Sequence, residues 1–146
     1  MSTGETPEAV ARTSATIMWR QDQASRALGM KLEVVAPGRA VLSMNIERRM
    51  VNGLEVCHGG FIFALADSAM AFASNSHGEH ALAQHCAITF LRPARLGDRL
   101  VANAVERARQ GRTALYDVAV TANDLLIAEF RGHTRSTGER FIQAAT

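Results

Sequence analysis

The chain has 146 residues, of which 47% are hydrophobic, and its formal net charge is only +2. This length and composition suit one globular domain with its own core and exclude a disordered chain. The small charge, without a block of basic residues interleaved with aromatic ones, argues against nucleic acid as a partner. Cys57 and Cys86 are too few for a disulfide scaffold, and residues 1–5 lack a signal pattern, so we expect a cytoplasmic protein.

Hydrophobic alternation and turn residues predict the elements in the order helix, two strands, long helix and four strands. The expected ranges are 8–28, 31–35, 40–47, 59–76, 83–91, 99–108, 113–121 and 126–136. In the last of these strands, strict alternation points Leu126 inward and Ile127 outward. The order predicts one antiparallel sheet curled around one buried helix, an α+β fold. We expect a tail and helix over residues 1–28 and a single domain over residues 29–146.

The predicted helix over residues 59–76 is the centre of the chain. It is rich in Ala and Phe, contains no proline and is apolar at most positions, so we expect it to be wrapped on all sides. Asp67 interrupts this run, which makes it too short and too polar for a helix that crosses a membrane. A carboxylate inside such a helix is costly unless it is paired or used, so Asp67 is the leading candidate for a functional residue.

Two glycines, Gly59 and Gly60, stand where this helix begins. Glycine lets the backbone approach a ligand closely, and the first N–H groups of a helix lack partners and carry partial positive charge. This end could hold a polarised carbonyl oxygen or an anion. The alternative is a tight turn that only leads the chain into the helix.

The spacing between Gly59 and Asp67 bears on the oligomeric state. Eight residues along one helix span about 12 Å, so one substrate carbonyl cannot contact both. If both act on one substrate, they must come from two antiparallel copies of the helix. The spacing therefore favours a symmetric dimer with two composite sites.

Three groups of motifs carry a resemblance to a known family. They are Asn52-Gly53…His58-Gly59-Gly60…Leu65-Ala66-Asp67-Ser68, Phe90-Leu91-Arg92-Pro93-Ala94…Gly97-Asp98, and Gly111-Arg112-Thr113…Tyr116-Asp117-Val118. With fifteen residues from Asn52 to Asp67, this set resembles the hotdog-fold acyl-CoA thioesterases, most of all their phenylacetate-degradation (PaaI) branch. The resemblance covers nearly the whole chain beyond the first helix.

The resemblance implies roles for individual residues. In such enzymes the helix carboxylate, here Asp67, comes from the neighbouring subunit and serves as nucleophile or general base. The N–H at the position of Gly59 polarises the thioester carbonyl, and the amide at the position of Asn52 orients water or that carbonyl. Some relatives carry a hydroxyl in the strand after the helix, where this chain has Ala, Gln and His at residues 83–85. Ser68 is a candidate for that role, although a helix turns by about 100° between neighbours.

The resemblance also implies a substrate and an assembly. The substrate would be an acyl-CoA with a (hydroxy)phenylacetyl or related aryl or medium-chain acyl group, and coenzyme A would be part of it, with no separate cofactor. A homo-oligomer, a dimer of dimers, is expected. The candidates for an apolar acyl pocket, which could equally pack the core, are Phe61, Phe63 and Met70. The candidates for contacts with the coenzyme A phosphates, which could equally be solvated, are Arg92, Arg95 and Arg112.

Other polar residues with possible chemical roles stand near the glycines and after the helix. His58 could assist the carbonyl site or brace the turn. Cys57 does not form a catalytic pair with it, because adjacent side chains in an extended segment point apart. The histidines at positions 77, 80 and 85 lack the cysteine or carboxylate companions of a metal site, so no metal is expected.

Two alternatives to a thioesterase remain from the sequence. A hotdog hydratase or dehydratase uses a catalytic histidine with a carboxylate in runs such as His-Phe-Pro, which this chain lacks. A non-catalytic acyl-CoA-binding module needs no carboxylate inside the helix. The missing histidine runs argue against the first alternative and the lone Asp67 argues against the second, so hydrolysis is favoured.

Overall fold

The computed structural model describes residues 4–142, so part of the predicted tail lies outside the described residues. The elements are α1 (Pro7–Gln21), α2 (Gln23–Ala27), β1 (Lys31–Ala36), β2 (Arg39–Asn45), the 3-10 turn η1 (Arg48–Met50), α3 (Gly59–Asn75), β3 (Glu79–Phe90), β4 (Arg99–Gln110), β5 (Thr113–Ala122) and β6 (Leu125–Arg140). This order confirms the predicted α+β arrangement of one sheet and one long central helix.

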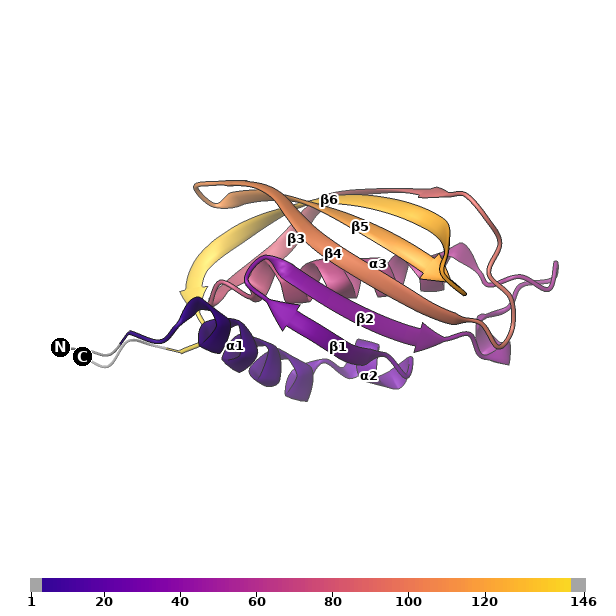
Figure 1. Ribbon diagram of the computed structural model, residues 1–146, viewed down its shortest axis with the longest axis horizontal. Coiled ribbons are helices and arrows are strands. Elements are labelled where there is room, and N and C mark those ends of the chain that lie inside the picture. The colour runs from indigo at the N-terminus through magenta and orange to yellow at the C-terminus, as the bar shows by residue number, and fades with distance from the viewer. Residues whose placement is uncertain (1–3, 143–146) are drawn as a thin grey trace.

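The sheet is antiparallel, and its strands lie in the order β1-β2-β4-β5-β6-β3. The chain passes along α3 between β2 and β3, and this passage carries β3 to the far edge of the sheet beside β6 (Figure 1). Among the described residues, β3 therefore has one edge without a hydrogen-bonded neighbouring strand. Side chains on β3 are mostly exposed, Leu82 by 66%.

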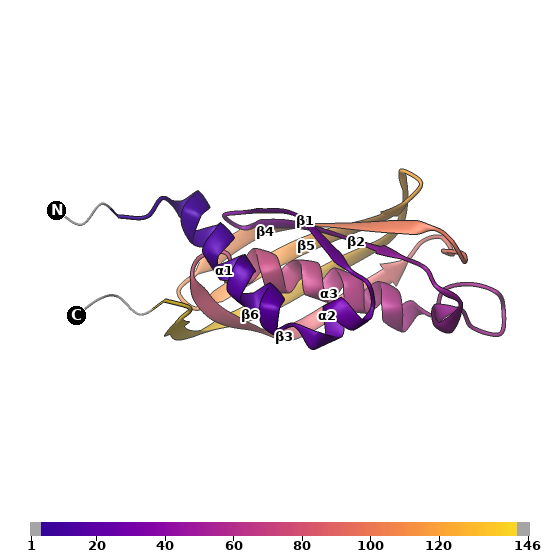
Figure 2. The ribbon, with the colours of Figure 1, turned by 90° about the horizontal axis from the view of Figure 1, so that it is seen from below.

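Helix α3 supplies the middle of the core. The concave face of the sheet covers one side of it, and α1 and α2 lie on the other side (Figure 2). Leu65, Met70 and Phe72 are fully buried, and each contributes about 1.5–3 kcal/mol of transfer free energy. Gly132 of β6 allows close contact, because a side chain there would overlap the sulfur of Met70.

The predicted single helix over residues 8–28 is wrong at Asp22. There the chain leaves helical geometry, and the Asp22 side chain accepts a hydrogen bond from the Ser25 N–H at 2.9 Å. Asp at such a position competes with the helical backbone and favours a new helix start. The segment is therefore divided into α1 and α2.

The predicted facing of the last strand is wrong at its first two residues. Ile127 is 2% exposed and Leu126 is 37% exposed, the reverse of the expectation. The register with β5 shifts by one residue here, since Val120 pairs with Ala128 but Thr121 pairs with Leu126. A bulge of one residue reverses the facing of every residue before it.

Candidate active site

The first turn of α3 presents one free backbone donor. His58 caps the helix, and its Nδ1 atom accepts the Gly60 N–H at 2.9 Å. The Phe61 N–H donates to the carbonyl oxygen of His58 at 3.0 Å. Within the described residues, no acceptor engages the Gly59 N–H. Of the two predicted glycine donors, Gly59 is thus the one left to bind a ligand, at the positive end of the helix.

His58 is oriented by the same contact. Because Nδ1 accepts a hydrogen bond, the proton of the neutral imidazole resides on Nε2. The side chain is exposed and packs edge-on against Phe61, with 6.1 Å between the ring centroids. His58 therefore braces the helix start with one nitrogen and offers a second donor with the other, which joins the two roles weighed from the sequence.

Asn52 lies in the loop that precedes α3. Its Oδ1 atom accepts the N–H groups of Leu54 at 2.9 Å and Val56 at 3.4 Å. This loop is tied to the helix start, because the His58 N–H donates to the Met50 carbonyl at 2.7 Å. No hydrogen bond to a described residue engages the Nδ2 group of Asn52, so it remains available as a donor. The turn therefore orients the Asn52 side chain so that its Oδ1 atom faces the backbone of the loop.

Phe90, which the sequence analysis did not single out for the site, lies against Gly59. A Cβ atom on Gly59 would come within 2.7 Å of the Phe90 Cζ atom. The ring belongs to the exposed end of β3 and is 49% exposed. Gly59 is therefore required for close packing as well as for a free N–H, and Phe90 forms one wall beside that N–H.

Asp67 is partly exposed and has no hydrogen-bond partner among the described residues. Burial raises its pKa above the ordinary value of 3.8. The thiol pKa of Cys86 on β3 is raised by burial and by the negative charge of Asp67, which makes Cys86 a neighbour of this carboxylate. Only the tertiary fold brings the two together, so no sequence pattern indicated Cys86.

Ser68 points toward the N-terminal helices. The buried Ser25 hydroxyl donates to the Asp22 carboxylate at 2.7 Å and lies 2.9 Å from the Ser68 hydroxyl. A serine has one hydroxyl proton, so Ser68 is the donor in the second contact. Ser68 therefore anchors α3 to α2, and its proton is not directed at Asp67.

The aromatic and sulfur side chains predicted for the acyl pocket separate into two groups. Phe61 is half-buried beside His58 at the helix start. Phe63 packs edge-on against Phe130 of the sheet, with 5.2 Å between centroids, and Met70 is buried against Gly132. Phe90 thus lies beside Gly59 and Phe61 beside His58, while Phe63 packs against the sheet and Met70 packs the core.

The three arginines predicted to meet coenzyme A do not lie together within one chain. Arg92 and Arg95 are exposed and flank Ala94, whose carbonyl accepts the Cys57 N–H at 2.7 Å, so they lie near the start of α3. Arg112 lies in the β4–β5 hairpin and shares a cavity with His77, which follows the end of α3. Within one chain, the first pair lies toward the start of α3 and Arg112 toward its end.

The exposed positions of α3 form a stripe. Gly60 is exposed and Ala64, Asp67 and Ala71 are partly exposed, and these four recur every three or four residues along one face of the helix. The other partly exposed positions of the helix are Gly59, Phe61, Phe63 and Ser68. The edge of β3 that faces away from β6 is likewise unpaired among the described residues. Gly59 and Asp67 remain about 12 Å apart along the helix, as the spacing requires.

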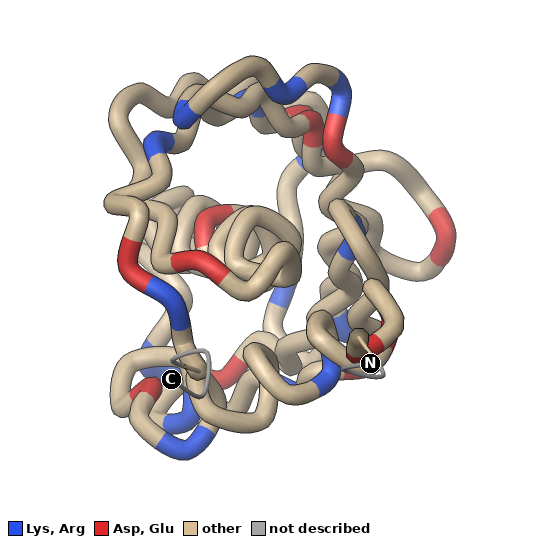
Figure 3. Tube along the Cα trace, turned by 90° about the vertical axis from the view of Figure 1, so that its left-hand side faces the viewer, with Lys and Arg blue, Asp and Glu red and all other residues tan. Residues whose placement is uncertain are grey.

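The remaining polar groups form no further cluster of the predicted kinds. Within residues 4–142, no three His, Cys, Asp or Glu side chains converge as metal ligands. None of the helices in the described part combines the length and apolar character needed to cross a membrane. Basic and acidic positions are interspersed around the ring of backbone that surrounds α3 (Figure 3).

Comparison with known proteins identifies related chains. Residues 54–128 match the model of the thioesterase superfamily. The acyl-coenzyme A thioesterase PaaI of Escherichia coli K12 is 40% identical over 126 residues, which cover 86% of this chain and 90% of that protein. The solved structure of the E. coli PaaI protein from the phenylacetic acid degradation operon superimposes with a TM-score of 0.90 at 37% identity, over 92% of this chain and 99% of that one. This match confirms the predicted hotdog fold.

A second solved structure carries a ligand. A Streptococcus mutans UA159 protein bound to acetyl CoA is 25% identical, with a TM-score of 0.73, over 76% of this chain and 90% of that one. Together these matches confirm the family resemblance drawn from the sequence motifs.

Proposed function

The chain belongs to the thioesterase superfamily, and from this premise we propose that it hydrolyses acyl-CoA thioesters at a site shared by two subunits. One observation carries the proposal. The unpaired N–H of Gly59 and the unpaired carboxylate of Asp67 lie on one helix, too far apart for one carbonyl, beside a free sheet edge.

The reaction begins with the thioester carbonyl oxygen at the start of α3. The Gly59 N–H donates to it, and the positive end of the helix stabilises the charge that develops on that oxygen. The Nε2–H of His58 is a second donor on the same side, and Asn52 Nδ2 orients the carbonyl or the attacking water. Phe90 and Phe61 limit the access of bulk water.

Asp67 of a second copy faces the carbonyl carbon. As general base it takes a proton from water while the water oxygen bonds to that carbon. The tetrahedral intermediate then collapses and breaks the C–S bond to release the thiolate of coenzyme A, a good leaving group at neutral pH. As nucleophile, the Asp67 carboxylate would instead bond to the carbonyl carbon and displace the coenzyme A thiolate as the C–S bond breaks, and water would then hydrolyse the resulting anhydride to the free acid and Asp67. Both routes need an ionised Asp67 opposite the Gly59 N–H.

The proposed dimer pairs the β3 edges and the α3 stripes of two chains. A two-fold axis between antiparallel helices places each Gly59 near the other chain's Asp67. The exposed Leu82 and the unpaired strand edge provide the apolar and hydrogen-bonding surface for this contact. We propose that two such dimers form a tetramer and that Arg92 and Arg95 contact the phosphates of coenzyme A. The free thiols of Cys57 and Cys86 fit the reducing cytoplasm.

For the acyl group we propose an aryl-acetyl unit, as in phenylacetyl-CoA and its hydroxylated forms. The support is Phe90 beside Gly59 and Phe61 beside His58 at the start of α3, together with the similarity to PaaI. A pocket between two helices is short and favours a compact ring over a long chain. We expect kcat/KM for phenylacetyl-CoA to exceed that for palmitoyl-CoA by about tenfold or more, roughly 1.4 kcal/mol of transition-state binding.

A thiol-release assay tests both levels of the proposal. The panel is acetyl-, hexanoyl-, palmitoyl-, benzoyl- and phenylacetyl-CoA, with Asp67→Asn and the exposed surface variant Glu129→Gln as a matched pair. We expect Asp67→Asn to lower kcat by about a hundredfold or more, and Glu129→Gln to leave it unchanged. Binding of acyl-CoA without thiol release would indicate a non-catalytic module. Preference for palmitoyl-CoA would overturn the aryl assignment alone.

A further inference from the structure

Helix α3 and strand β3 are held side by side at both ends. At the start of the helix, Gly59 lies against the ring of Phe90, the last residue of β3. At the end of the helix, the Asn75 amide binds the beginning of the same strand. Its Nδ2 atom donates to the Ala81 carbonyl at 3.1 Å, and its Oδ1 atom accepts the Ala81 N–H at 3.0 Å.

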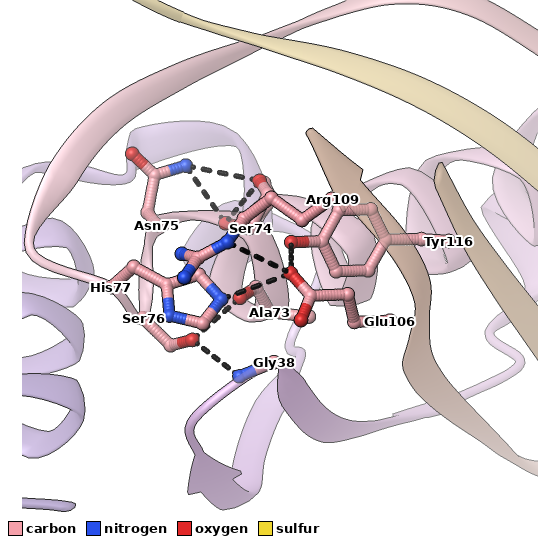
Figure 4. Close-up of polar contacts among 10 residues, drawn as sticks. Gly38, Ala73, Ser74, Asn75, Ser76, His77, Glu106, Arg109 and Tyr116 are labelled. Atoms are coloured by element: carbon pink, nitrogen blue, oxygen red, sulfur yellow. Dashed lines mark hydrogen bonds and ion pairs between the residues drawn. The ribbon is translucent and has the colours of Figure 1, made fainter. Parts of the chain in front are cut away.

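Further polar contacts fix the end of α3 in place (Figure 4). The Ser76 hydroxyl donates to the Ala73 carbonyl at 2.6 Å and accepts the Gly38 N–H at 2.8 Å. These contacts join the helix to the β1–β2 turn as well as to β3. Sliding of α3 along the strand would break them, so the alignment of the two elements can be followed residue by residue.

The two anchors determine which residue of β3 lies level with Asp67. Asp67 is midway along the anchored part of the helix, and residues 85 and 86 are midway along the anchored part of the strand. Of these, Cys86 faces the helix, because it pairs with Gly132, over which the sulfur of Met70 lies. Burial and the negative charge of Asp67 both raise the Cys86 thiol pKa, which agrees with this placement.

The spacings along the two elements support the same alignment. The eight residues from Gly59 to Asp67 span about 12 Å of helix, and the four residues from Phe90 to Cys86 span about 13 Å of strand. Phe90 is therefore level with Gly59, and Cys86 is level with Asp67.

This alignment determines the register between the two β3 edges of the proposed dimer. If each Gly59 faces the partner's Asp67, the two-fold axis passes midway between these two positions. The level residue of β3, midway between Phe90 and Cys86, is Ile88. An antiparallel ladder about this axis pairs Ile88 with its own copy, and so pairs Phe90 with the partner subunit's Cys86.

We propose that the partner subunit's Cys86 lines the acyl pocket opposite Phe90 and limits the size of the acyl group. This inference rests on the proposed function. Directly opposite residues of an antiparallel pair point to the same face, with Cβ atoms about 4.5–5.5 Å apart. A carbonyl held between the Gly59 N–H and the partner's Asp67 thus has the Phe90–Cys86 pair on its sheet side. The small thiol leaves room there for the ring of an aryl-acetyl group.

Disulfide cross-linking tests the pairing without reference to activity. Opposite residues of an antiparallel ladder have Cα atoms about 4.5–5.5 Å apart, within the range of about 4.4–6.8 Å that a disulfide spans. Under mild oxidation, Phe90→Cys should give a covalent dimer through the partner subunit's Cys86, and added Cys86→Ser should abolish it. Thr89→Cys, next to it on the exposed outward face, is the control and should give none. A covalent dimer that persists with Cys86→Ser, or none from Phe90→Cys, would overturn the register.

Substrate preference tests the role in the pocket. Cys86→Leu should lower kcat/KM for phenylacetyl-CoA about tenfold more than for acetyl-CoA, while Cys86→Ala should shift the preference severalfold toward the larger acyl group. Ala87→Leu, on the exposed outward face, should leave the ratio unchanged. A ratio that neither Cys86 variant alters, at unchanged melting temperatures, would overturn the role of Cys86. Covalent dimers from a chain that releases no thiol would support the pairing and contradict the proposed function, so the two failures are distinguishable.

Discussion

The ring of Phe90 lies directly against Gly59, with 2.7 Å between its Cζ atom and the position that a Cβ atom on Gly59 would take. Gly59→Ala must therefore move the ring or the helix start. We expect kcat/KM to fall about tenfold or more, because a small displacement of the Gly59 N–H disturbs the geometry around the carbonyl. Gly53→Ala is the matched control, since nothing lies within 4 Å of its Cβ position.

A second variant, Phe90→Leu, tests whether the loss of activity in Gly59→Ala is caused by steric overlap with the Phe90 ring. A smaller side chain on β3 makes room for the methyl group, so Gly59→Ala combined with Phe90→Leu should recover part of the activity lost in Gly59→Ala. Steady-state kinetics of the two single variants and the double variant measure this recovery. Additive losses would show that the Phe90 contact is not the reason for the glycine.

Asn52→Asp tests the role of the amide nitrogen. The carboxylate keeps the oxygen that accepts the Leu54 and Val56 N–H groups, so the turn is retained. The Nδ2 donor is lost, and we expect kcat to fall about tenfold or more with little change in melting temperature. A normal kcat would restrict Asn52 to a structural role in the turn.

Asp67→Asn should stabilise the fold while it abolishes turnover. Burial raises the Asp67 pKa in the folded state, so the folded chain binds a proton more tightly than the unfolded one. By linkage, the free energy of unfolding then falls as pH rises from the ordinary pKa through the raised value. The amide removes this loss, so the variant should melt at a higher temperature than the wild type at pH 7 and at a similar one near pH 3. A lower melting temperature of Asp67→Asn at pH 7 would contradict the conclusion that the ionised Asp67 carboxylate destabilises the fold.

The same pKa shift sets the acid limb of the pH–rate profile. Hydrolysis needs ionised Asp67, so kcat should fall as pH decreases through the raised pKa, which lies above 3.8. The profile of the wild type from pH 4 to 8 locates this limb. A kcat that stays constant down to the ordinary carboxylate range would show that burial does not govern the catalytic group.

Much of the fold could be predicted because its signals are local. The apolar run of α3 and the alternation of strands such as β2 are visible in consecutive residues. The helix break at Asp22 and the bulge at Ile127 were not predicted. The first depends on a side-chain hydrogen bond that starts a new helix, and the second on the register of two strands, and the periodicity of apolar residues reveals neither. The sequence also pointed to Gly59 and Asp67 as the chemical centre.

The partners of these site residues could not be predicted, because they come from distant segments. Phe90 contacts Gly59, and the thiol of Cys86 comes within electrostatic reach of Asp67, only because β3 lies at the far edge of the sheet. Ser68 was a candidate for the hydroxyl that some relatives carry in the following strand, and the sequence could not show that the Ser25 hydroxyl lies 2.9 Å from it. Spacing along one helix predicts which residues share a face, but it does not predict which residues of other elements contact that face.

The central claim is that each site takes Asn52 and Gly59 from one subunit and Asp67 from the other. Differently tagged chains can be co-expressed and doubly tagged dimers purified in two arrangements, with wild-type dimers carrying both tags as the reference. In the first arrangement, Asp67→Asn is on one chain and Asn52→Ala on the other. In the second, both changes are on one chain, paired with a wild-type chain.

Thiol release from these two hybrids is the most direct measurement. With shared sites, the first hybrid keeps one intact site and should show about half the wild-type activity per dimer, while the second has a defect in both sites and should be nearly inactive. Sites contained within single chains would reverse the result, with the second hybrid half-active and the first nearly inactive. That reversal, or a protein that hydrolyses thioesters as a monomer, would contradict the composite site.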